Sequence, residues 1–208
     1  MSSIKDILII LRSPFKRIGL KNKDFTIISN NCWGGVISRD RRLPYNSPTA
    51  GLLFFSDDYI QFLSNLKYYL SCDLVEMTTK ESKYSDYLYP KYGDSLIMGR
   101  IDDVEIVFLH YHDFKEAKEK WERRRKRVNF NNLLVKFSDQ NQFKKKNFEK
   151  FKEMKFDNKV FITIDESLKS DFTYVIPDQW GVGYAKDDIW PSFKVININK
   201  LLNEMKRK

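Results

Sequence analysis

Short apolar runs alternate with segments of helical periodicity from residue 25 to the end of the chain. Apolar runs of this length, rich in β-branched and aromatic residues, are typical of buried strands. They predict strands at residues 25–29, 52–55, 74–77, 105–111, 133–137, 159–164, 173–176 and 194–198. Apolar positions spaced three and four apart predict a helix starting near residue 33 and others over 57–70, 113–127, 140–155 and 201–208, with a tyrosine-rich connection at 80–92.

This alternation places the protein in the α/β class. Strands separated by helices form a mixed or mostly parallel sheet with helices on both faces. We therefore expect a single three-layer α/β/α domain over residues 23–208.

An amphipathic stripe precedes this domain. Its apolar members are Ile4, Ile7, Leu8 and Leu11, extended by Phe15 and Ile18, with lysines and arginines around them. A basic amphipathic helix over residues 1–22 would lie on an anionic membrane surface, with residues 4–18 making the contact. The alternative is an ordinary helix that docks on its own domain or on a dimer partner. The apolar run at residues 7–11 is too short for a signal peptide, and no small-residue cleavage site follows it.

The composition is that of a globular protein. Of the 208 residues, 42% are hydrophobic and 15% aromatic, which is far above the aromatic content of disordered chains. No apolar run approaches the roughly 20 residues that a membrane-spanning helix needs. Cys32 and Cys72 fit neither a disulfide framework nor a zinc-ligand spacing. The sequence therefore predicts a cytoplasmic protein, held at the inner face of the membrane if the N-terminal helix binds there.

The net charge of +9 is concentrated in two blocks. Residues 1–24 hold six basic and two acidic side chains, and residues 115–155 hold fifteen basic and six acidic ones, so the rest of the chain sums to −4. Such blocks attract nucleic acid, an anionic membrane or a phosphorylated substrate. Nucleic acid is the least favoured partner, because neither an RNA-binding aromatic motif nor a helix-turn-helix pattern accompanies the charge.

The turn that follows the first strand is the first candidate site. Its residues are Asn30, Asn31, Cys32, Trp33, Gly34 and Gly35. Two glycines where a helix begins allow close backbone approach, and unpaired N–H groups there can hold a phosphate or a carboxylate. The pattern is neither a dinucleotide fingerprint nor a P-loop, and a tight turn that packs the helix on the strand explains it equally well. Cys32 would be a nucleophile only with His110 beside it, and a buried structural cysteine is the commoner case.

A basic segment supplies the second candidate. On a helix, Trp121, Arg124 and Arg127 share one face, and they could clamp a diphosphate while the indole stacks on a ring. A solvated basic helix anchored by one core tryptophan is the alternative. Lys136 lies inside an apolar strand and needs a partner, which is either a protein carboxylate or a ligand phosphate.

Histidine and aspartate supply the remaining chemistry. His110 could act as a general base, or be a hydrogen-bonded structural residue, and His112 is more simply structural. Asp57 and Asp58 have the form of acidic pairs that hold Mg²⁺ with a nucleotide-sugar, but acids at a helix N-terminus capped by Ser56 explain them more simply. We therefore assign no metal ligands, and Asp102–Asp103 and Asp187–Asp188 are interpreted as turn or cap residues.

Aromatic residues gather on a glycine-containing loop at residues 177–184, which continues to Trp190. Such rings either stack on a sugar face or cover the end of the core.

Four segments carry a family resemblance: IISNNCWGG at 27–35, YNSPTAGLLFFSDDYIQFL at 45–63, FLHY at 108–111 and AKEKWERRRKRVNFNNLLVKFS at 117–138. Together they resemble the DUF1919 family, often labelled exopolysaccharide biosynthesis proteins, over residues 25–165, with residues 1–22 outside the resemblance. The family implies a three-layer α/β domain encoded among genes for capsule or exopolysaccharide assembly. Its motif positions here are Asn30, Asn31, Cys32, Trp33, Gly34, Gly35, Tyr45, Ser47, Pro48, His110, Trp121, Arg124, Arg127, Asn129 and Lys136.

The resemblance narrows the pathway but supplies no settled reaction, and the hypothesis that we favour is a transferase of bacterial surface-polysaccharide assembly. The favoured reaction is glycosyl transfer from a sugar nucleotide to a lipid-linked oligosaccharide acceptor at the cytoplasmic membrane face. Arg124, Arg127 and Lys136 would neutralise a diphosphate, and His110 would deprotonate the acceptor hydroxyl. The alternatives are acyl transfer to a sugar hydroxyl and a non-catalytic binding or scaffold protein of the same machinery.

Overall fold

The computed structural model describes residues 15–207. The predicted helix over residues 1–22 and the membrane contact of residues 4–18 therefore lie mostly outside the described residues. Phe15 and Ile18 are described, and both are exposed, whereas Leu20 is buried against the domain. No helix among residues 15–207 has the length and apolar character needed to cross a bilayer.

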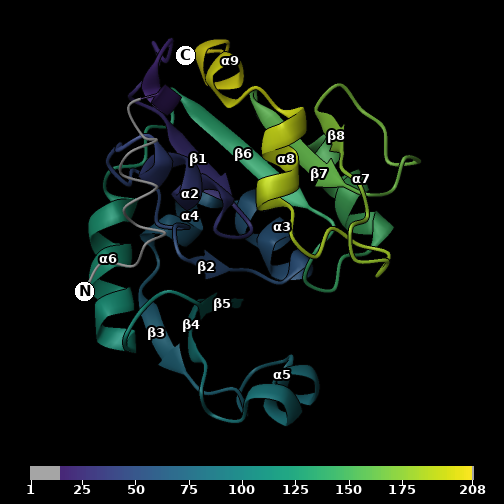
Figure 1. Ribbon diagram of the computed structural model, residues 1–208. Coiled ribbons are helices and arrows are strands. Elements are labelled where there is room, and N and C mark those ends of the chain that lie inside the picture. Colours follow the sequence, from purple (N-terminus) through teal and green to yellow (C-terminus); the bar gives the residue numbers. More distant parts are fainter. Residues whose placement is uncertain (1–14, 208) are drawn as a thin grey trace.

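Residues 15–17 are helical, and sixteen further elements follow in chain order between residues 26 and 203 (Figure 1). They are β1 (Thr26–Ser29), α2 (Trp33–Asp40), β2 (Leu52–Leu53), α3 (Ser56–Ser64), α4 (Leu66–Ser71), β3 (Leu74–Met77), α5 (Ser85–Tyr92), β4 (Ile97–Ile101), β5 (Val104–Phe108), α6 (Phe114–Arg125), β6 (Leu133–Ser138), α7 (Lys145–Glu153), β7 (Lys159–Thr163), β8 (Thr173–Val175), α8 (Ile189–Val195) and α9 (Ile198–Asn203).

The strands form two four-stranded sheets. One is parallel, in the order β1-β6-β7-β8, and the other is antiparallel, in the order β2-β5-β4-β3. The α/β class is confirmed, but the strands are divided between two sheets instead of sharing one mixed sheet. Parallel strands require crossover connections. Helix α7 lies in the one between β6 and β7, a loop without a helix joins β7 to β8, and a tight turn joins the antiparallel strands β4 and β5.

Successive residues of the parallel strands face two different cores. Ile27 and Leu134 pack against α2, α8 and α9, whereas Ile28 and Val135 face α3, α6, α7 and the antiparallel sheet. Because both faces of the sheet are buried, the strands are nearly continuous apolar runs. Such runs can be recognised in the sequence.

Several predicted boundaries are corrected. The predicted strand at 194–198 is wrong: α8 ends at Val195 and α9 begins at Ile198, with the Asn197 side chain accepting the Lys200 N–H at 3.0 Å as a cap. The predicted helix over 57–70 is broken at Asn65, and Ser56 donates its hydroxyl to the Gln140 carbonyl at 2.6 Å instead of capping. Strand β4 and helix α5 were missed.

The strand predicted at 105–111 ends early, at Phe108. His110 and His112 consequently lie in the loop before α6, where Asp113 caps the helix by accepting the Glu116 N–H at 2.8 Å. This loop brings His110 to the edge of the candidate site.

Candidate functional site

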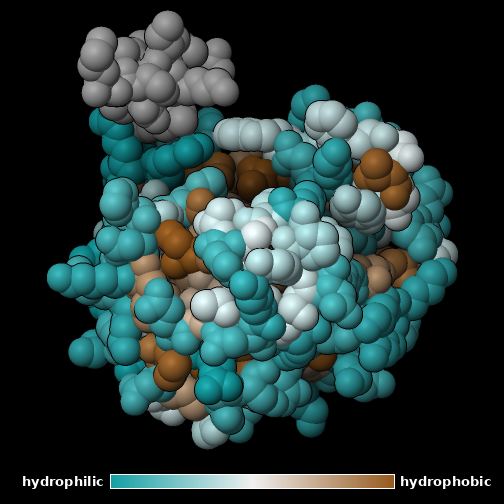
Figure 2. All heavy atoms as spheres, turned by 90° about the horizontal axis from the view of Figure 1, so that it is seen from below, coloured by the Kyte–Doolittle hydropathy of each residue, from teal (hydrophilic) through white to brown (hydrophobic). Residues whose placement is uncertain are grey.

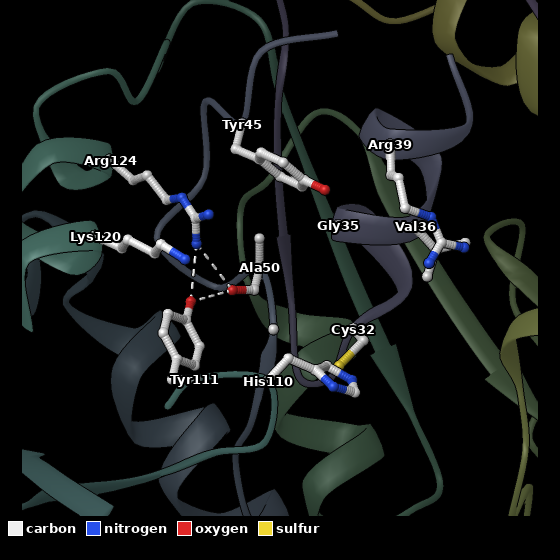
Figure 3. Close-up of a pocket in the computed structure, with 11 residues that line it drawn as sticks. Cys32, Gly35, Val36, Arg39, Tyr45, Ala50, His110, Tyr111, Lys120 and Arg124 are labelled. Carbon is white, nitrogen blue, oxygen red and sulfur yellow. Dashed lines mark hydrogen bonds between the residues drawn. The ribbon is translucent and has the colours of Figure 1, made fainter. Parts of the chain in front are cut away.

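A pocket of about 300 Å³ lies between helices α2 and α6, beside the loops that precede β2 and follow β5 (Figure 3). Four segments contribute to it: the first turns of α2, the loop that leads into β2, the loop after β5, and α6. Its lining residues are Cys32, Gly35, Val36, Arg39, Tyr45, Ala50, Gly51, His110, Tyr111, Lys120 and Arg124.

Arg124 is held in position by two neighbours. Its Nη1 donates to the Tyr111 hydroxyl oxygen at 2.8 Å and to the Ala50 carbonyl at 3.1 Å, as the dashed lines of Figure 3 show. The Tyr45 ring lies 4.8 Å from the guanidinium carbon, a cation–π distance. The Tyr111 hydroxyl itself donates to the Ala50 carbonyl, and burial raises the pKa of this phenol, so it remains a donor at neutral pH. The guanidinium is thus oriented before any ligand binds.

Arg39 and Lys120 add two further cations to the lining. Lys120 pairs with Glu116 at 2.5 Å, and Arg39 lies 3.3 Å from Asp40, but neither acid lines the pocket. The described lining therefore has three cationic side chains and no carboxylate. Charges of one sign at a concave surface attract a ligand of the opposite sign, here an anion.

Cys32 and His110 lie at the same end of the pocket as viewed in Figure 3. Burial, reinforced by the charge of Asp188, raises the pKa of the Cys32 thiol to about 11. The thiol is therefore neutral at physiological pH, and this disfavours a nucleophilic role. His110 is exposed, and its backbone N–H donates to the Gly51 carbonyl at 3.1 Å, which leaves the imidazole facing the pocket and solvent.

Of the residues predicted from sequence, Gly35, His110 and Arg124 come together in this pocket. Asn30, Asn31 and Lys136 do not line it, because they belong to a buried polar network behind it. Lys136 is fully buried and pairs with Asp188. Of the two partners expected for Lys136, a carboxylate of the protein is the one observed.

The polar side chains of this buried network bond to one another. Lys136 Nζ donates to Asn30 Oδ1 at 3.1 Å, to Asn31 Oδ1 at 3.2 Å and to Ser138 Oγ at 2.9 Å. Asn31 Nδ2 donates to Asp188 Oδ1 at 2.9 Å, and Asn31 Oδ1 accepts the Trp33 N–H at 3.1 Å. Burial lowers the pKa of Lys136, and the charge of Asp188 opposes this. Asp188 stands at the N-cap position of α8, in line with its interpretation from sequence, but its side chain makes no capping bond and is the counter-ion of a buried lysine.

Three predicted ligand-binding residues are buried in the cores. Trp33 is inaccessible and donates its indole N–H to Ser192 Oγ at 2.9 Å, and Trp121 is 1% exposed. A Cβ at Gly34 would lie 2.8 Å from Ile27 Cγ2, so this glycine permits α2 to pack on β1. The stacking role of Trp121 and the phosphate-binding roles of Trp33 and Gly34 do not fit these positions.

Arg127 and Asn129 lie away from the pocket. Helix α6 ends at Arg125, so Arg127 is exposed beyond the helix and does not share a face with Arg124. The Asn129 side chain donates to Asp24 Oδ2 at 3.1 Å, and its backbone N–H donates to Thr26 Oγ1 at 2.9 Å. Asn129 therefore anchors the chain beside β1.

Four polar side chains that line the pocket were not predicted as site residues: Arg39, Tyr45, Tyr111 and Lys120. Lys120 is four residues before Arg124, a spacing that places both on one face of α6 and was a usable signal. Tyr45 was noted only as a motif position. Nothing in the local sequence indicated that Arg39 would face the same cavity.

The carboxylates of Asp57 and Asp58 contact other side chains of the protein. Asp57 accepts from Lys144 Nζ and Asn147 Nδ2, each at 2.7 Å, and Asp58 pairs with Lys83 at 2.5 Å. Within residues 15–207, no group of three or more His, Cys, Asp or Glu side chains is arranged to hold a metal ion.

The chain belongs to the DUF1919 family, described as a domain of unknown function, whose family model matches residues 4–200. This match extends beyond the segments at 25–165 and takes in most of the N-terminal segment. A protein of Haemophilus influenzae strain Rd, named "Uncharacterized protein", is 35% identical over 144 residues. That match covers 69% of this chain and 64% of the relative, so the chain spans less than two thirds of that protein's length.

Proposed function

We propose that the protein is a transferase of bacterial surface-polysaccharide assembly whose pocket holds a phosphate or diphosphate of its substrate. The observation that carries the proposal is the placement of Arg39, Lys120 and Arg124 around one cavity whose described lining has no acidic residue. The favoured reaction is glycosyl transfer to a lipid-linked acceptor at the cytoplasmic membrane face.

The geometry around Arg124 favours an oxyanion ligand. A guanidinium presents planar N–H donors that match phosphate oxygens, and Nη1 alone makes the two bonds to the protein. Because Tyr45 and Tyr111 already orient the side chain, little rotamer freedom is lost on binding. The volume of about 300 Å³ is at the lower end of small-molecule sites, which suits a sugar phosphate or diphosphate better than an entire lipid-linked substrate.

In this reaction His110 takes the proton of the acceptor hydroxyl. The hydroxyl oxygen forms a bond to the anomeric carbon of the donor, and the bond from that carbon to the phosphate oxygen breaks. The leaving phosphate carries the electron pair away, and Arg124 and Lys120 stabilise its charge. His110 borders the cavity at its solvent-exposed side, where an acceptor would enter.

The family resemblance supports the proposed role in polysaccharide assembly. The cationic lining of the pocket supports an anionic substrate. Acyl transfer through a cysteine thioester is less favoured, because the Cys32 pKa of about 11 keeps the thiol protonated. An acyl transfer that uses His110 as base, and a protein that only binds its ligand, remain the competing proposals.

A donor screen separates these proposals. Thermal shifts of the purified protein are measured with UDP-, GDP- and CMP-sugars and with acetyl-CoA, with and without Mg²⁺, because a ligand that binds the folded state raises Tm. We expect a shift with a nucleoside-diphosphate sugar in the wild type and in Arg123→Ala, and its loss in Arg124→Ala. Arg123 is an exposed neighbour on α6, so it is a matched charge control.

The outcomes are distinct. A shift with acetyl-CoA alone would assign acyl transfer, and no shift with any donor would contradict the transferase proposal. If bacterial membranes supply the acceptor, His110→Ala should retain the donor shift and lose turnover. Turnover at the wild-type rate in His110→Ala would remove the histidine from the mechanism, and donor binding without turnover in the wild type would indicate a binding protein.

A further inference from the structure

Three neighbouring parallel strands begin at the same end of the molecule (Figure 1). Strand β1 begins at Thr26, β6 at Leu133 and β7 at Lys159, so the segments that lead into these strands are neighbours. Helix α9 and the C-terminal residues lie at this end as well. The Lys206 N–H donates to Asn158 Oδ1 at 2.7 Å, which joins the C-terminal segment to the start of β7. The charges of these segments therefore belong to one surface.

Two adjoining depressions mark this surface. Their volumes are about 380 and 220 Å³, and Asn131 lines both. The described linings hold six cationic side chains, all of them exposed: Lys21, Lys23, Lys67, Lys155, Lys206 and Arg207. The same linings hold two carboxylates, those of Asp24 and Asp157, so six cations less two anions leave an excess of four positive charges. Such an excess on one face attracts an anionic partner.

Apolar side chains are exposed beside these cations. Phe15 and Ile18 expose 73% and 70% of their surface, in the segment that continues into the first depression. Phe130 lines the second depression and is 37% exposed, and Lys67 Nζ lies 5.3 Å from its ring centroid. Exposed apolar side chains among lysines and arginines are typical of surfaces that bind anionic bilayers.

The segment at residues 15–22 is fixed to α9 by asparagine side chains. Asn199 Nδ2 donates to the Ile18 carbonyl at 2.9 Å, and Asn203 Nδ2 donates to the Gly19 carbonyl at 2.7 Å. The exposed apolar side chains are thus presented by an anchored segment. Little conformational entropy is lost when side chains on such a segment bind a partner.

The apolar side chains distinguish a membrane from a nucleic acid. Both partners are polyanions, and lysines and arginines bind the phosphate groups of either. A bilayer also has an acyl layer beneath its headgroups, which receives apolar side chains such as Phe15 and Ile18. Ile18 has no flat face on which a base could stack, and neither side chain forms hydrogen bonds to base edges.

We propose that this end of the molecule docks on an anionic lipid bilayer, through the six cations of the two depressions together with Phe15 and Ile18. The cations would contact the lipid headgroups, and the two apolar side chains would enter the acyl boundary. Docking here would hold the chain at the cytoplasmic membrane, where the proposed function, on which this choice of membrane rests, places its lipid-linked acceptor.

The opposite end of the molecule differs from this surface. Figure 2 views the molecule from that end, where α5 lies, and hydrophilic residues cover most of the face, with apolar residues in small separate groups. Residues 79–95, which include α5, hold three basic and three acidic side chains, so they carry no positive excess. Docking through the α9 end would therefore leave the α5 end in solvent.

Sedimentation of the full chain with lipid vesicles tests this proposal. Mixed phosphatidylglycerol and phosphatidylcholine vesicles are compared with phosphatidylcholine vesicles at increasing NaCl. We expect binding to the anionic vesicles alone, weakening with salt because screening reduces the attraction between exposed charges.

Variants locate the attachment. A cation near an anionic bilayer accounts for about fivefold in affinity, so two double variants should each bind at least about tenfold more weakly: Lys21→Gln/Lys23→Gln and Lys206→Gln/Arg207→Gln. Phe15→Ser/Ile18→Ser keeps the charge and should also weaken binding by about tenfold or more. Lys80→Gln/Lys91→Gln removes the same charge near α5, where Lys80 lies 4.8 Å from the Tyr89 ring centroid, and should bind as the wild type does.

The other outcomes overturn the proposal. Equal binding to neutral and anionic vesicles, or an equal loss in the control variant, would exclude a specific basic surface. Wild-type affinity in both double variants would assign attachment to residues before Phe15. A gel shift with an oligonucleotide that the double variants lose, without vesicle binding by the wild type, would assign the surface to nucleic acid. Arg124→Ala should attach to vesicles normally, so failure here is distinguishable from failure of the proposed pocket function.

Discussion

The Lys136 ammonium and the Asp188 carboxylate form an ion pair in which neither side chain exposes more than 1% of its surface. The pair joins β6 to the segment that enters α8, and Asn31 bonds to both partners. Asn31 also accepts the Trp33 N–H at the start of α2. The buried pair therefore fixes the turn from which Cys32 and Gly35 reach the pocket.

Removal of one partner should be strongly destabilising. Asp188→Asn leaves a buried lysine without its counter-ion, a change that costs about 3–5 kcal/mol of unfolding free energy. The double variant Lys136→Met/Asp188→Leu, which removes both charges, should lose less than the single variant. Urea unfolding at pH 7 measures both, and a loss below about 1 kcal/mol in Asp188→Asn would show that the pair does not stabilise the fold.

The stability of Asp188→Asn should depend on pH. Burial already lowers the pKa of Lys136 in the folded state, and loss of Asp188 lowers it further. Between this folded pKa and the unfolded value near 10.5, the unfolded chain binds more protons, so stability rises with pH by up to about 1.4 kcal/mol per unit.

The difference in unfolding free energy between the wild type and Asp188→Asn should accordingly become smaller between pH 7 and pH 9.5 in urea titrations. Lys136→Met/Asp188→Asn has no lysine to titrate and is the control. A deficit that stays constant over this range, or one that the control shares, would contradict the lowered pKa.

Cys32 should react slowly with alkylating agents. A pKa of about 11 leaves roughly 100-fold less thiolate at pH 7.5 than a pKa of about 9 would. Mass spectrometry of iodoacetamide labelling should show slow modification that accelerates as the pH rises toward 11. Rapid labelling at pH 7.5 would indicate an activated thiol and return Cys32 to the list of nucleophiles.

Gly34→Ala should disturb the contact between α2 and β1. The new Cβ would lie 2.8 Å from Ile27 Cγ2, and both groups belong to packed elements. Overpacking of this kind destabilises by about 1–3 kcal/mol, measured as a lower urea midpoint. An unchanged midpoint would show that α2 can shift away from the sheet without loss.

Strands of the parallel sheet were predictable because both of their faces are buried, as Ile27 and Ile28 illustrate. The antiparallel sheet was harder to recognise, since β2 has two residues and β4 contains Gly99, a poor strand former. The alternation of strands and helices therefore predicted the class, and the division into two sheets depended on contacts between distant segments.

Individual polar residues could be singled out from the sequence where they interrupt an apolar pattern. Lys136 was conspicuous in an apolar strand, but its partner Asp188 lies 52 residues away and no local pattern joins them. Arg124, a site candidate from its place in the basic helix, lines the pocket, whereas the sequence around Arg39 did not distinguish it from other surface cations. Convergence of separate helices is a property of packing, so a single sequence does not reveal it.

Isothermal titration of pyrophosphate into the wild type, Arg124→Ala and Arg123→Ala decides whether the pocket is an anion site. We predict saturable binding by the wild type and by Arg123→Ala, with affinity about tenfold or more lower in Arg124→Ala, because a positioned guanidinium contributes charge-assisted hydrogen bonds. The folded state of each variant is verified by its melting temperature. Absence of binding by the wild type, or equal affinity in Arg124→Ala, would contradict an anionic substrate in this pocket.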